Sequence, residues 1–363
     1  SEVTAAFVST NSICQGQQVA ILWPLLFDQQ FEITFAHTSF KWSNLASHKA
    51  GVTVVIIAIG NQSRTNKRLF VVSESNDVFE RVVENINPYL VPSRNVLVGK
   101  SSLPCGELTP MDRGSGPVDN GNFFLRQSEK DLLVNAHPNS RTLIKPYSNS
   151  EEFINGKQRF CLWITDDRLD QAMAVPEIRH RIDNIKKYRL ASTKAATRAD
   201  AETPHKFSEI RHRPGNCTIV VPRVSSESRP FLPVGLLSGD VVVGDRNFAL
   251  YDAPLWNMAL IASRLHWVWI GTVCVRMRTD FSYSNTLGWN TFPAPPLTEK
   301  NKADLTRCAE GILLAREAHF PATIADLYDP DNMPPNLRQA HERNDEVLER
   351  IYIGRRFKND TER

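Results

Sequence analysis

The stretch AAFVSTNSICQGQQVAILWPLLF, residues 5–27, determines how the chain begins to fold. Residues 5–10 form a short apolar run rich in β-forming side chains, which predicts a strand. The longer apolar run Val19–Phe27 predicts a helix. Between them, Ser12 and Gln15 have the Ser-x-x-Gln spacing of a capping box, so we expect Ser12 to cap this helix.

Two further β-rich runs, Phe31–His37 and Val52–Ile59, complete a strand–helix–strand–strand order. This order is typical of the later part of an α/β sheet. A nucleotide-binding sheet of this class usually opens on a glycine-rich turn from strand to helix, and the sequence contains no such turn. We therefore expect late strands of a Rossmann-like sheet whose earlier half precedes Ser1.

The composition is that of an ordinary globular protein. With 363 residues, 41% hydrophobic and 23% charged, the chain is long enough for about two or three domains. Its six cysteines are spread too widely for the paired spacing of a zinc site, and we expect reduced thiols. No run approaches the ~18 consecutive apolar residues of a membrane span, and no signal sequence opens the chain. We expect a cytoplasmic protein without a membrane partner.

The net charge of +3 conceals a basic region in the middle of the chain. Residues 179–213 hold ten Lys or Arg against four Asp or Glu, whereas residues 298–363 hold eleven against thirteen. A helix is expected to begin after Pro176, with one apolar face formed by Ile178, Ile182 and Ile185. Its basic residues suit the tracking of a nucleic-acid backbone. The competing interpretation is a charged face that contacts only water.

Composition also divides the chain. Ser, Pro, Gly and Asp crowd residues 101–122, which marks a loop or junction, and we place a domain boundary near residues 85–100. An apolar helix with three tryptophans is expected from Leu255 to about Ile270. Helical patterns return from Leu305. Short strands are expected at residues 160–164, 218–224 and 241–243. Breaks in the C-terminal helices are expected at residues 320–321 and 333–335.

Residues 274–284, CVRMRTDFSYS, alternate polar and apolar side chains. Read as one strand, this period of two places Arg276, Arg278 and Asp280 in one row. Such a row suits the edges of base pairs, where arginine matches guanine and aspartate matches the amino group of cytosine. The alternative is a solvated sheet face with cross-strand ion pairs.

Several motifs in a shared order resemble the amino-group DNA methyltransferases, and within them the MmeI-like (type IIL restriction–modification) group. The resemblance covers nearly the whole chain. The motifs are Phe7–Ile13, Gln15–Val19, Phe35–His37, Phe40–Trp42, Val52–Ile59, Ile154–Gly156, Arg189–Ser192, Val221–Glu227, Asn290–Pro293, Leu327–Pro330 and Met333–Pro334.

The resemblance implies methyl transfer from S-adenosylmethionine to the amino group of an adenine flipped out of a specific duplex site. This chain lacks the group's glycine-containing cofactor motif and its Asn/Asp-Pro-Pro-Tyr/Phe catalytic motif. We therefore expect no cofactor and no catalytic residue in this chain, and an N-terminal methyltransferase half as a partner. The expected division is residues 1–90, the end of the catalytic domain; 91–297, a mixed target-recognition domain; and 298–363, a helical tail.

The resemblance and the sequence pattern together give three sets of candidate site residues. The target-base pocket is expected to include Phe40, which would stack on the base, with Trp42 and Asn11. Base readout in double-stranded DNA is assigned to Arg276, Arg278 and Asp280. The backbone contacts are assigned to Arg179, Lys186, Lys187, Arg189, Lys194, Arg198 and Arg223.

The expected function is DNA target recognition, with part of the base-flipping pocket, in a fragment of a sequence-specific adenine methyltransferase. One alternative is a stand-alone DNA-binding specificity protein without catalysis. Another is a methyltransferase that acts on a small molecule, against which the basic helix argues.

Overall fold

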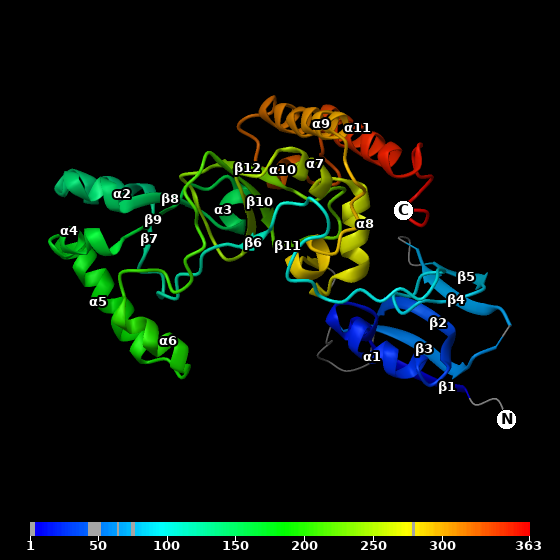
Figure 1. Cartoon of the computed structure of the whole chain (residues 1–363). Coiled ribbons are helices and arrows are strands. Elements are labelled where there is room, and N and C mark those ends of the chain that lie inside the picture. The colour runs from blue at the N-terminus through cyan, green and yellow to red at the C-terminus, as the bar shows by residue number, and fades with distance from the viewer. Residues whose placement is uncertain (1–3, 43–51, 64, 74–76, 278–279) are drawn as a thin grey trace.

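The computed structural model describes residues 4–42, 52–63, 65–73, 77–277 and 280–363. Figure 1 shows an N-terminal sheet at one end, a central region covered by the C-terminal helices, and an outer lobe of short helices at the other end. None of the described helices is long and apolar enough to cross a membrane. The fold is a mixture of α/β and α+β parts with open sheets and a helical C-terminal region.

The N-terminal sheet has the strand order β1-β3-β2-β4-β5. Strands β1 and β2 both run antiparallel to β3, which lies between them, so the helix α1 connects two strands that point the same way. β2 pairs with β4 in parallel, and β4 with β5 antiparallel. The bounds are β1 Thr4–Thr10, α1 Gln17–Phe27, β2 Phe31–Lys41, β3 Thr53–Asn61, β4 Lys67–Val72 and β5 Val78–Val83. The predicted order of strand, helix, strand and strand is confirmed.

α1 covers one face of this sheet. Trp23 is fully buried there with Val19, and its indole N–H donates to the Ile13 carbonyl at 2.7 Å. The predicted capping box is wrong, because α1 begins at Gln17 with Gly16 as its N-cap. Ser12 lies in a separate 3-10 turn, η1 Asn11–Cys14, and its hydroxyl bonds that of Thr10 instead.

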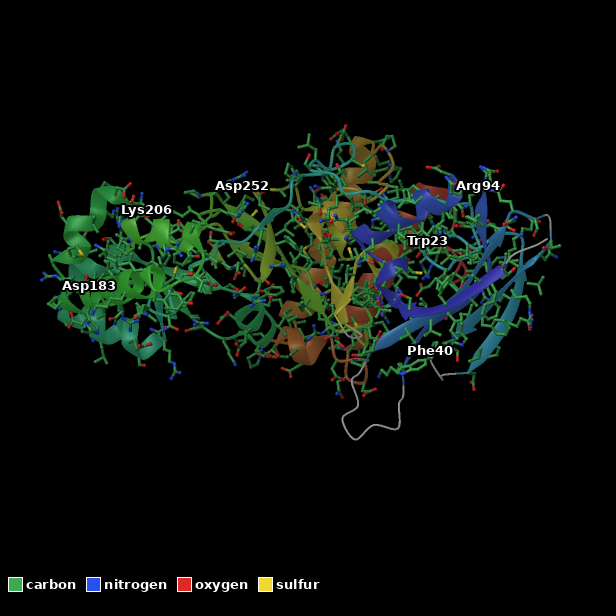
Figure 2. The ribbon with its side chains drawn as sticks, turned by 90° about the horizontal axis from the view of Figure 1, so that it is seen from below. Trp23, Phe40, Arg94, Asp183, Lys206 and Asp252 are labelled. Atoms are coloured by element: carbon green, nitrogen blue, oxygen red, sulfur yellow. The ribbon has the colours of Figure 1, made fainter. Side chains whose placement is uncertain are left out.

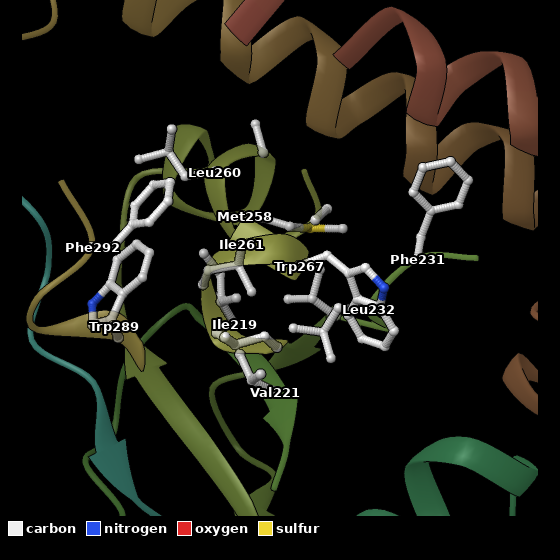
Figure 3. Packing of buried hydrophobic residues seen from close by; sticks show 14 of the residues in the cluster. Ile219, Val221, Phe231, Leu232, Met258, Leu260, Ile261, Trp267, Trp289 and Phe292 are labelled. Carbon is white, nitrogen blue, oxygen red and sulfur yellow. The ribbon is translucent and has the colours of Figure 1, made fainter. Parts of the chain in front are cut away.

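The central region is built on an antiparallel sheet of order β12-β10-β14-β6. The helices α7 and α8 pack against it around a large apolar core (Figure 3). The predicted single helix over residues 255–270 is two helices: the first ends at Ile261, and Ser263 caps the second by accepting from the His266 N–H. The bounds are β6 Asp112–Arg113, β10 Cys217–Pro222, β12 Gly235–Ser238, β14 Asn247–Tyr251, α7 Trp256–Ile261 and α8 Arg264–Val273.

The outer lobe contains a second four-stranded sheet, of order β13-β8-β9-β7, with its own apolar core. The three predicted isoleucines of the basic helix are buried in that core. The strands are β7 Phe124–Leu125, β8 Ile144–Ser148, β9 Phe160–Leu162 and β13 Val242–Val243. The helices of the lobe are α2 Gln127–Ala136, η2 Pro138–Leu143, η3 Asp166–Arg168, α4 Leu169–Met173, α5 Pro176–Leu190, α6 Ala195–Ala199 and η4 Asp200–Glu202. The short helix α3 Ser150–Asn155 lies beside the central sheet, where its Phe153 packs against Val220 and Ala249 (Figure 1).

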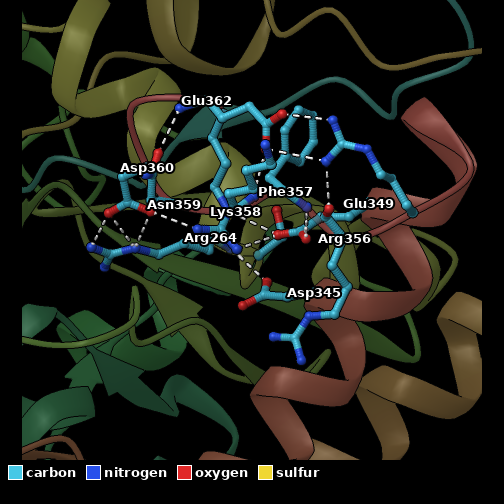
Figure 4. Close-up of polar contacts among 12 residues, drawn as sticks. Arg264, Asp345, Glu349, Arg356, Phe357, Lys358, Asn359, Asp360 and Glu362 are labelled. Carbon is cyan, nitrogen blue, oxygen red and sulfur yellow. Dashed lines mark hydrogen bonds and ion pairs between the residues drawn. The ribbon is translucent and has the colours of Figure 1, made fainter.

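The C-terminal helices close over the central core. They are α9 Glu299–Glu317, α10 Ile324–Leu327 and α11 Pro335–Ile353, preceded by the turn η5 Asn285–Trp289. Both predicted helix breaks are confirmed. The last residues fold back onto α8 and α11: Arg264 pairs with Asp360, and the Arg264 backbone N–H donates to Asp345 (Figure 4).

Candidate nucleic-acid interface

Three predicted pocket residues lie at one edge of the N-terminal sheet, and we call Asn11, Phe40 and Trp42 the pocket edge. Thr10, which precedes Asn11, and Phe40 are both opposite Val54 on β3. Directly opposed residues in antiparallel strands point to the same face. The ends of β1 and β2 therefore lie on either side of Val54, although α1 separates them in the sequence.

Phe40 lies within β2, because this strand continues through an irregular register to Lys41 instead of ending at His37 as predicted. Phe40 is opposite Val54, whereas the adjacent Val55 is buried with Trp23 beneath α1, so the Phe40 ring is on the face away from α1 (Figure 2). The ring meets His37 edge to face at 4.8 Å between centroids. Trp42 is 45% exposed. A partly exposed aromatic surface of this kind offers a flat face on which a base can stack.

Asn11 adds an unsatisfied donor to the pocket edge. Its side-chain amide nitrogen is buried and has no hydrogen-bond partner among the described residues. A buried amide without a partner is unfavourable by about 1–3 kcal/mol. A ligand with an acceptor atom, such as a base edge, would relieve this.

The stretch 274–284 is not one strand but two short antiparallel strands, β15 Arg276–Met277 and β16 Asp280–Ser282, which we call the hairpin. Arg276 is opposite Phe281, and its guanidinium lies 4.5 Å from that ring. Asp280 is adjacent to Phe281 along β16, so it points to the other face. The predicted single row of charges is therefore wrong, and Arg278 lies outside the described residues.

The charges of the hairpin have partners on the neighbouring segment. β16 also pairs with β11, Val224–Ser225, which completes a three-stranded sheet. The Arg276 guanidinium donates to Glu227 at 2.6 Å. Burial lowers the pKa of Arg229, and the carboxylate of Asp280 offsets part of this effect. Sequence reasoning missed Glu227 and Arg229 as partners, because a strand's own period does not show what lies across the sheet.

Arg223 belongs to a cluster of arginines around Asp245. It donates to the Asp245 carbonyl at 2.9 Å, while Arg113 pairs with the Asp245 carboxylate at 3.0 Å. Burial, and then the charges of Arg113 and Arg246, lower the pKa of Arg223. Only Arg113 is paired with the Asp245 carboxylate, so the three arginines carry more positive charge than this one carboxylate offsets, which favours anion binding. No pattern in the sequence pointed to this cluster, because Arg113 lies on β6, more than one hundred residues before Asp245 and Arg246.

The predicted basic residues of this region lie on two helices, α5 and α6. The helix α5 ends at Leu190, and Lys194 caps the separate helix α6. Lys186, Lys187 and Lys194 are exposed and make no ion pair with a described residue. Arg179 donates to the Met173 carbonyl, and Arg198 to the Ser192 and Thr193 carbonyls, but both remain at the surface.

Arg189 is the exception on α5. It is completely buried, and its guanidinium donates to five backbone carbonyls at 2.7–3.2 Å. These acceptors occupy all three nitrogens, so none of them is free to bind a phosphate. The prediction of a backbone contact by Arg189 is contradicted, and its role here is structural. The acceptors are Pro117, Val118, Asp200, Thr203 and Lys206.

The pocket edge by itself lacks the groups that usually bind the implied methyl donor. The pocket edge offers two aromatic rings and an amide, but no carboxylate that would bind a ribose, and no glycine-rich turn is present. We assign no step of methyl transfer to residues of this chain. Within the described part of the chain, no group of three or more His, Cys, Asp or Glu is placed to hold a metal ion.

Family models divide the chain into three consecutive matches. Residues 92–296 match the MmeI target recognition domain, residues 1–71 the MmeI DNA-methyltransferase domain, and residues 297–363 the MmeI C-terminal domain. The chain belongs to the MmeI family. The resemblance seen in its sequence motifs is confirmed, and the family is one of DNA methyltransferases of restriction–modification systems.

Two relatives show how far the likeness to the MmeI family extends. "DNA methyltransferase A" of Bacillus subtilis (strain 168) is 39% identical over 359 residues, which is 99% of this chain and 40% of that protein. The structure of the type IIL restriction–modification enzyme MmeI in complex with DNA superposes with a TM-score of 0.91 at 33% identity, over 99% of this chain and 48% of that one. The chain thus spans less than half the length of both relatives.

Proposed function

We propose that this chain supplies DNA target recognition, and part of a base-flipping pocket, to a sequence-specific DNA adenine methyltransferase of the restriction–modification type. The superposition on MmeI, which was solved with DNA, carries the proposal, because it extends over nearly the whole chain. The proposed division is a catalytic-domain part at residues 1–90, a recognition domain at 91–297 and a helical segment at 298–363.

We further propose that the chain is a fragment of a longer enzyme. β1 is an edge strand of the N-terminal sheet, and its side chains Phe7 and Val8 are more than half exposed. An uncovered apolar edge strand is a ready surface for another strand. In this proposal an N-terminal half completes a Rossmann-like sheet, supplies the catalytic motif and binds S-adenosylmethionine, in the cytoplasm.

Each proposed contact has a distinct role. Phe40, Trp42 and Asn11 hold the flipped adenine, since they form the pocket edge. Asp280 and Arg278 read base edges from the hairpin, and Arg276 supports them through its pair with Glu227. The sequence-independent backbone contacts come from Lys186, Lys187, Lys194, Arg179, Arg198 and Arg223.

The test compares this chain with the full-length enzyme. The chain alone should bind duplex DNA with strong salt dependence but neither bind S-adenosylmethionine nor transfer tritiated methyl groups, whereas the full-length enzyme should methylate one specific site. Turnover by the chain alone would refute the fragment proposal. If the full-length polypeptide binds DNA specifically but does not methylate it, the alternative of a stand-alone specificity protein is favoured. The absence of the catalytic motif from this sequence is the observation behind that alternative. A preference for a small-molecule acceptor would refute both.

Exchanging the charges of the hairpin tests the base readout. In the full-length enzyme, Arg278→Glu with Asp280→Arg should change the preferred base pair at one position of the site, because each good contact discriminates by about 1–3 kcal/mol. A methylation profile on a randomised DNA library measures this. If the variant is folded and active yet methylates the same sites, the hairpin does not read bases.

A further inference from the structure

The segment of residues 11–16, which we call the connecting segment, joins the pocket edge to the hairpin. At its far end the Gly16 N–H donates to the Val273 carbonyl at 3.0 Å, where α8 ends. One residue earlier, the side-chain oxygen of Gln15 accepts from the Arg276 backbone N–H at 3.3 Å. Two hydrogen bonds therefore attach the segment to the last residue of α8 and to the first residue of β15.

Gly16 shows how close this contact is. It is buried, and its φ of +64° with ψ of −154° is a conformation that essentially only glycine adopts. A Cβ atom at this position would lie 2.3 Å from a methyl carbon of Val275. The Val275 side chain, just before the hairpin, thus occupies the space into which the side chain of any other residue at position 16 would extend.

The other end of the connecting segment is fixed to the N-terminal sheet. Asn11 follows β1 directly, the Ile13 carbonyl accepts from the Trp23 indole, and Cys14 is buried in the core between α1 and the sheet. Six residues therefore link an amide of the pocket edge to the backbone of the hairpin, and both ends are held.

We propose that the connecting segment is a spacer that fixes the distance between the bases read by the hairpin and the adenine that enters the pocket. Gln15 and Gly16 are then positioning residues, which select the number of base pairs between recognition and methylation. This inference rests on the proposed function, and it explains why the methylated base lies at a fixed distance from the recognised bases.

A second contact also joins the N-terminal sheet to the central region, so the connecting segment is not needed merely to hold them together. Tyr89 packs against both the N-terminal and the central core, and its hydroxyl accepts from the Val98 N–H at 3.0 Å. Because this contact does not involve the connecting segment, loss of the Gln15 hydrogen bond leaves the two parts joined. Loss of the Gln15 hydrogen bond changes only how firmly the hairpin is held relative to the pocket edge.

The experiment uses the full-length enzyme and two DNA substrates: the methylation site, and the same site with one base pair inserted between the recognised bases and the target adenine. The insertion moves the adenine by about 3.4 Å along the duplex. Wild type should strongly prefer the normal spacing. For Gln15→Ala the ratio of kcat/KM on normal to spaced DNA should fall roughly 10-fold, with kcat on normal DNA reduced, and with DNA affinity and melting temperature unchanged.

Matched variants distinguish the outcomes. Gln15→Glu keeps an acceptor oxygen and should retain the wild-type ratio, and Gln18→Ala, exposed on the first turn of α1, should behave as wild type. Gly16→Ala should lower the ratio further; if it fails to fold, Gln15→Ala decides. An unchanged ratio for Gln15→Ala, or a lower melting temperature as its only effect, would overturn the proposal. A wild-type enzyme without site-specific methylation would instead refute the proposed function.

Discussion

Replacing Arg189 by methionine tests whether this arginine supports the fold or contacts DNA. The side chain of methionine has a similar length but no donor. Three of the five carbonyls that now accept from the guanidinium, those of Pro117, Asp200 and Thr203, keep a backbone N–H as donor, whereas those of Val118 and Lys206 have no other donor among the described residues. Each buried carbonyl left without a hydrogen bond is unfavourable by about 1–3 kcal/mol. The Val118 and Lys206 carbonyls, left without a donor, should therefore lower the free energy of unfolding by about 4 kcal/mol in total.

For a unit the size of the recognition domain, about 2–4 °C of melting temperature corresponds to each kcal/mol. Arg189→Met should therefore lower the melting transition of the outer lobe by roughly 8–16 °C. Lys187→Met, an exposed position of the same helix, is the control and should change stability by less than about 0.5 kcal/mol. Thermal melting and salt-dependent DNA binding are measured on both. An Arg189→Met variant that melts like wild type but binds DNA more weakly would refute the structural assignment.

Three further predictions concern DNA contacts, the pocket and pH. Replacing Lys186, Lys187 and Lys194 with alanine should weaken binding of the chain to all duplex sequences alike and reduce the slope of log affinity against log salt by about 0.9 per lost phosphate contact, as measured by fluorescence titration; an unchanged slope would mean that these lysines contact only water. Phe40→Ala should reduce methylation by the full-length enzyme more than Phe40→Trp does. The loss caused by Phe40→Ala should be smaller when the target adenine is mismatched, because extrusion of the base then requires less energy. Equal losses of methylation for both variants, together with a lower melting temperature, would place Phe40 in the core instead. Burial raises the pKa of Asp345 to about 7, so between about pH 4 and 7 the folded protein keeps a proton that the unfolded chain releases, and stability falls as pH rises through this window. Asp345→Asn retains an acceptor for the Arg264 N–H and should gain stability over wild type at pH 8, by at most about 4 kcal/mol, but not at pH 4; urea unfolding that shows the same difference at both pH values would contradict this.

The sequence alone determined the elements that depend on local pattern. The period of the isoleucines predicted the buried face of α5, since a helix repeats its faces every 3.6 residues wherever it lies. The apolar runs of the first sixty residues predicted β1, α1, β2 and β3. The ordered motifs were sufficient for the family.

Only the tertiary structure decided which polar partner each charged side chain finds. The same local pattern that placed Arg189 among DNA-binding residues contains no information about Pro117 and Val118, whose carbonyls surround it from more than seventy residues away. Likewise, the alternation at 274–284 fits one strand or two, and the cross-strand pairing of Arg276 with Phe281 distinguishes them. Burial of apolar side chains follows from periodicity along the chain. The partner of a charged group, in contrast, depends on which distant backbone and side chains the fold brings within hydrogen-bonding distance.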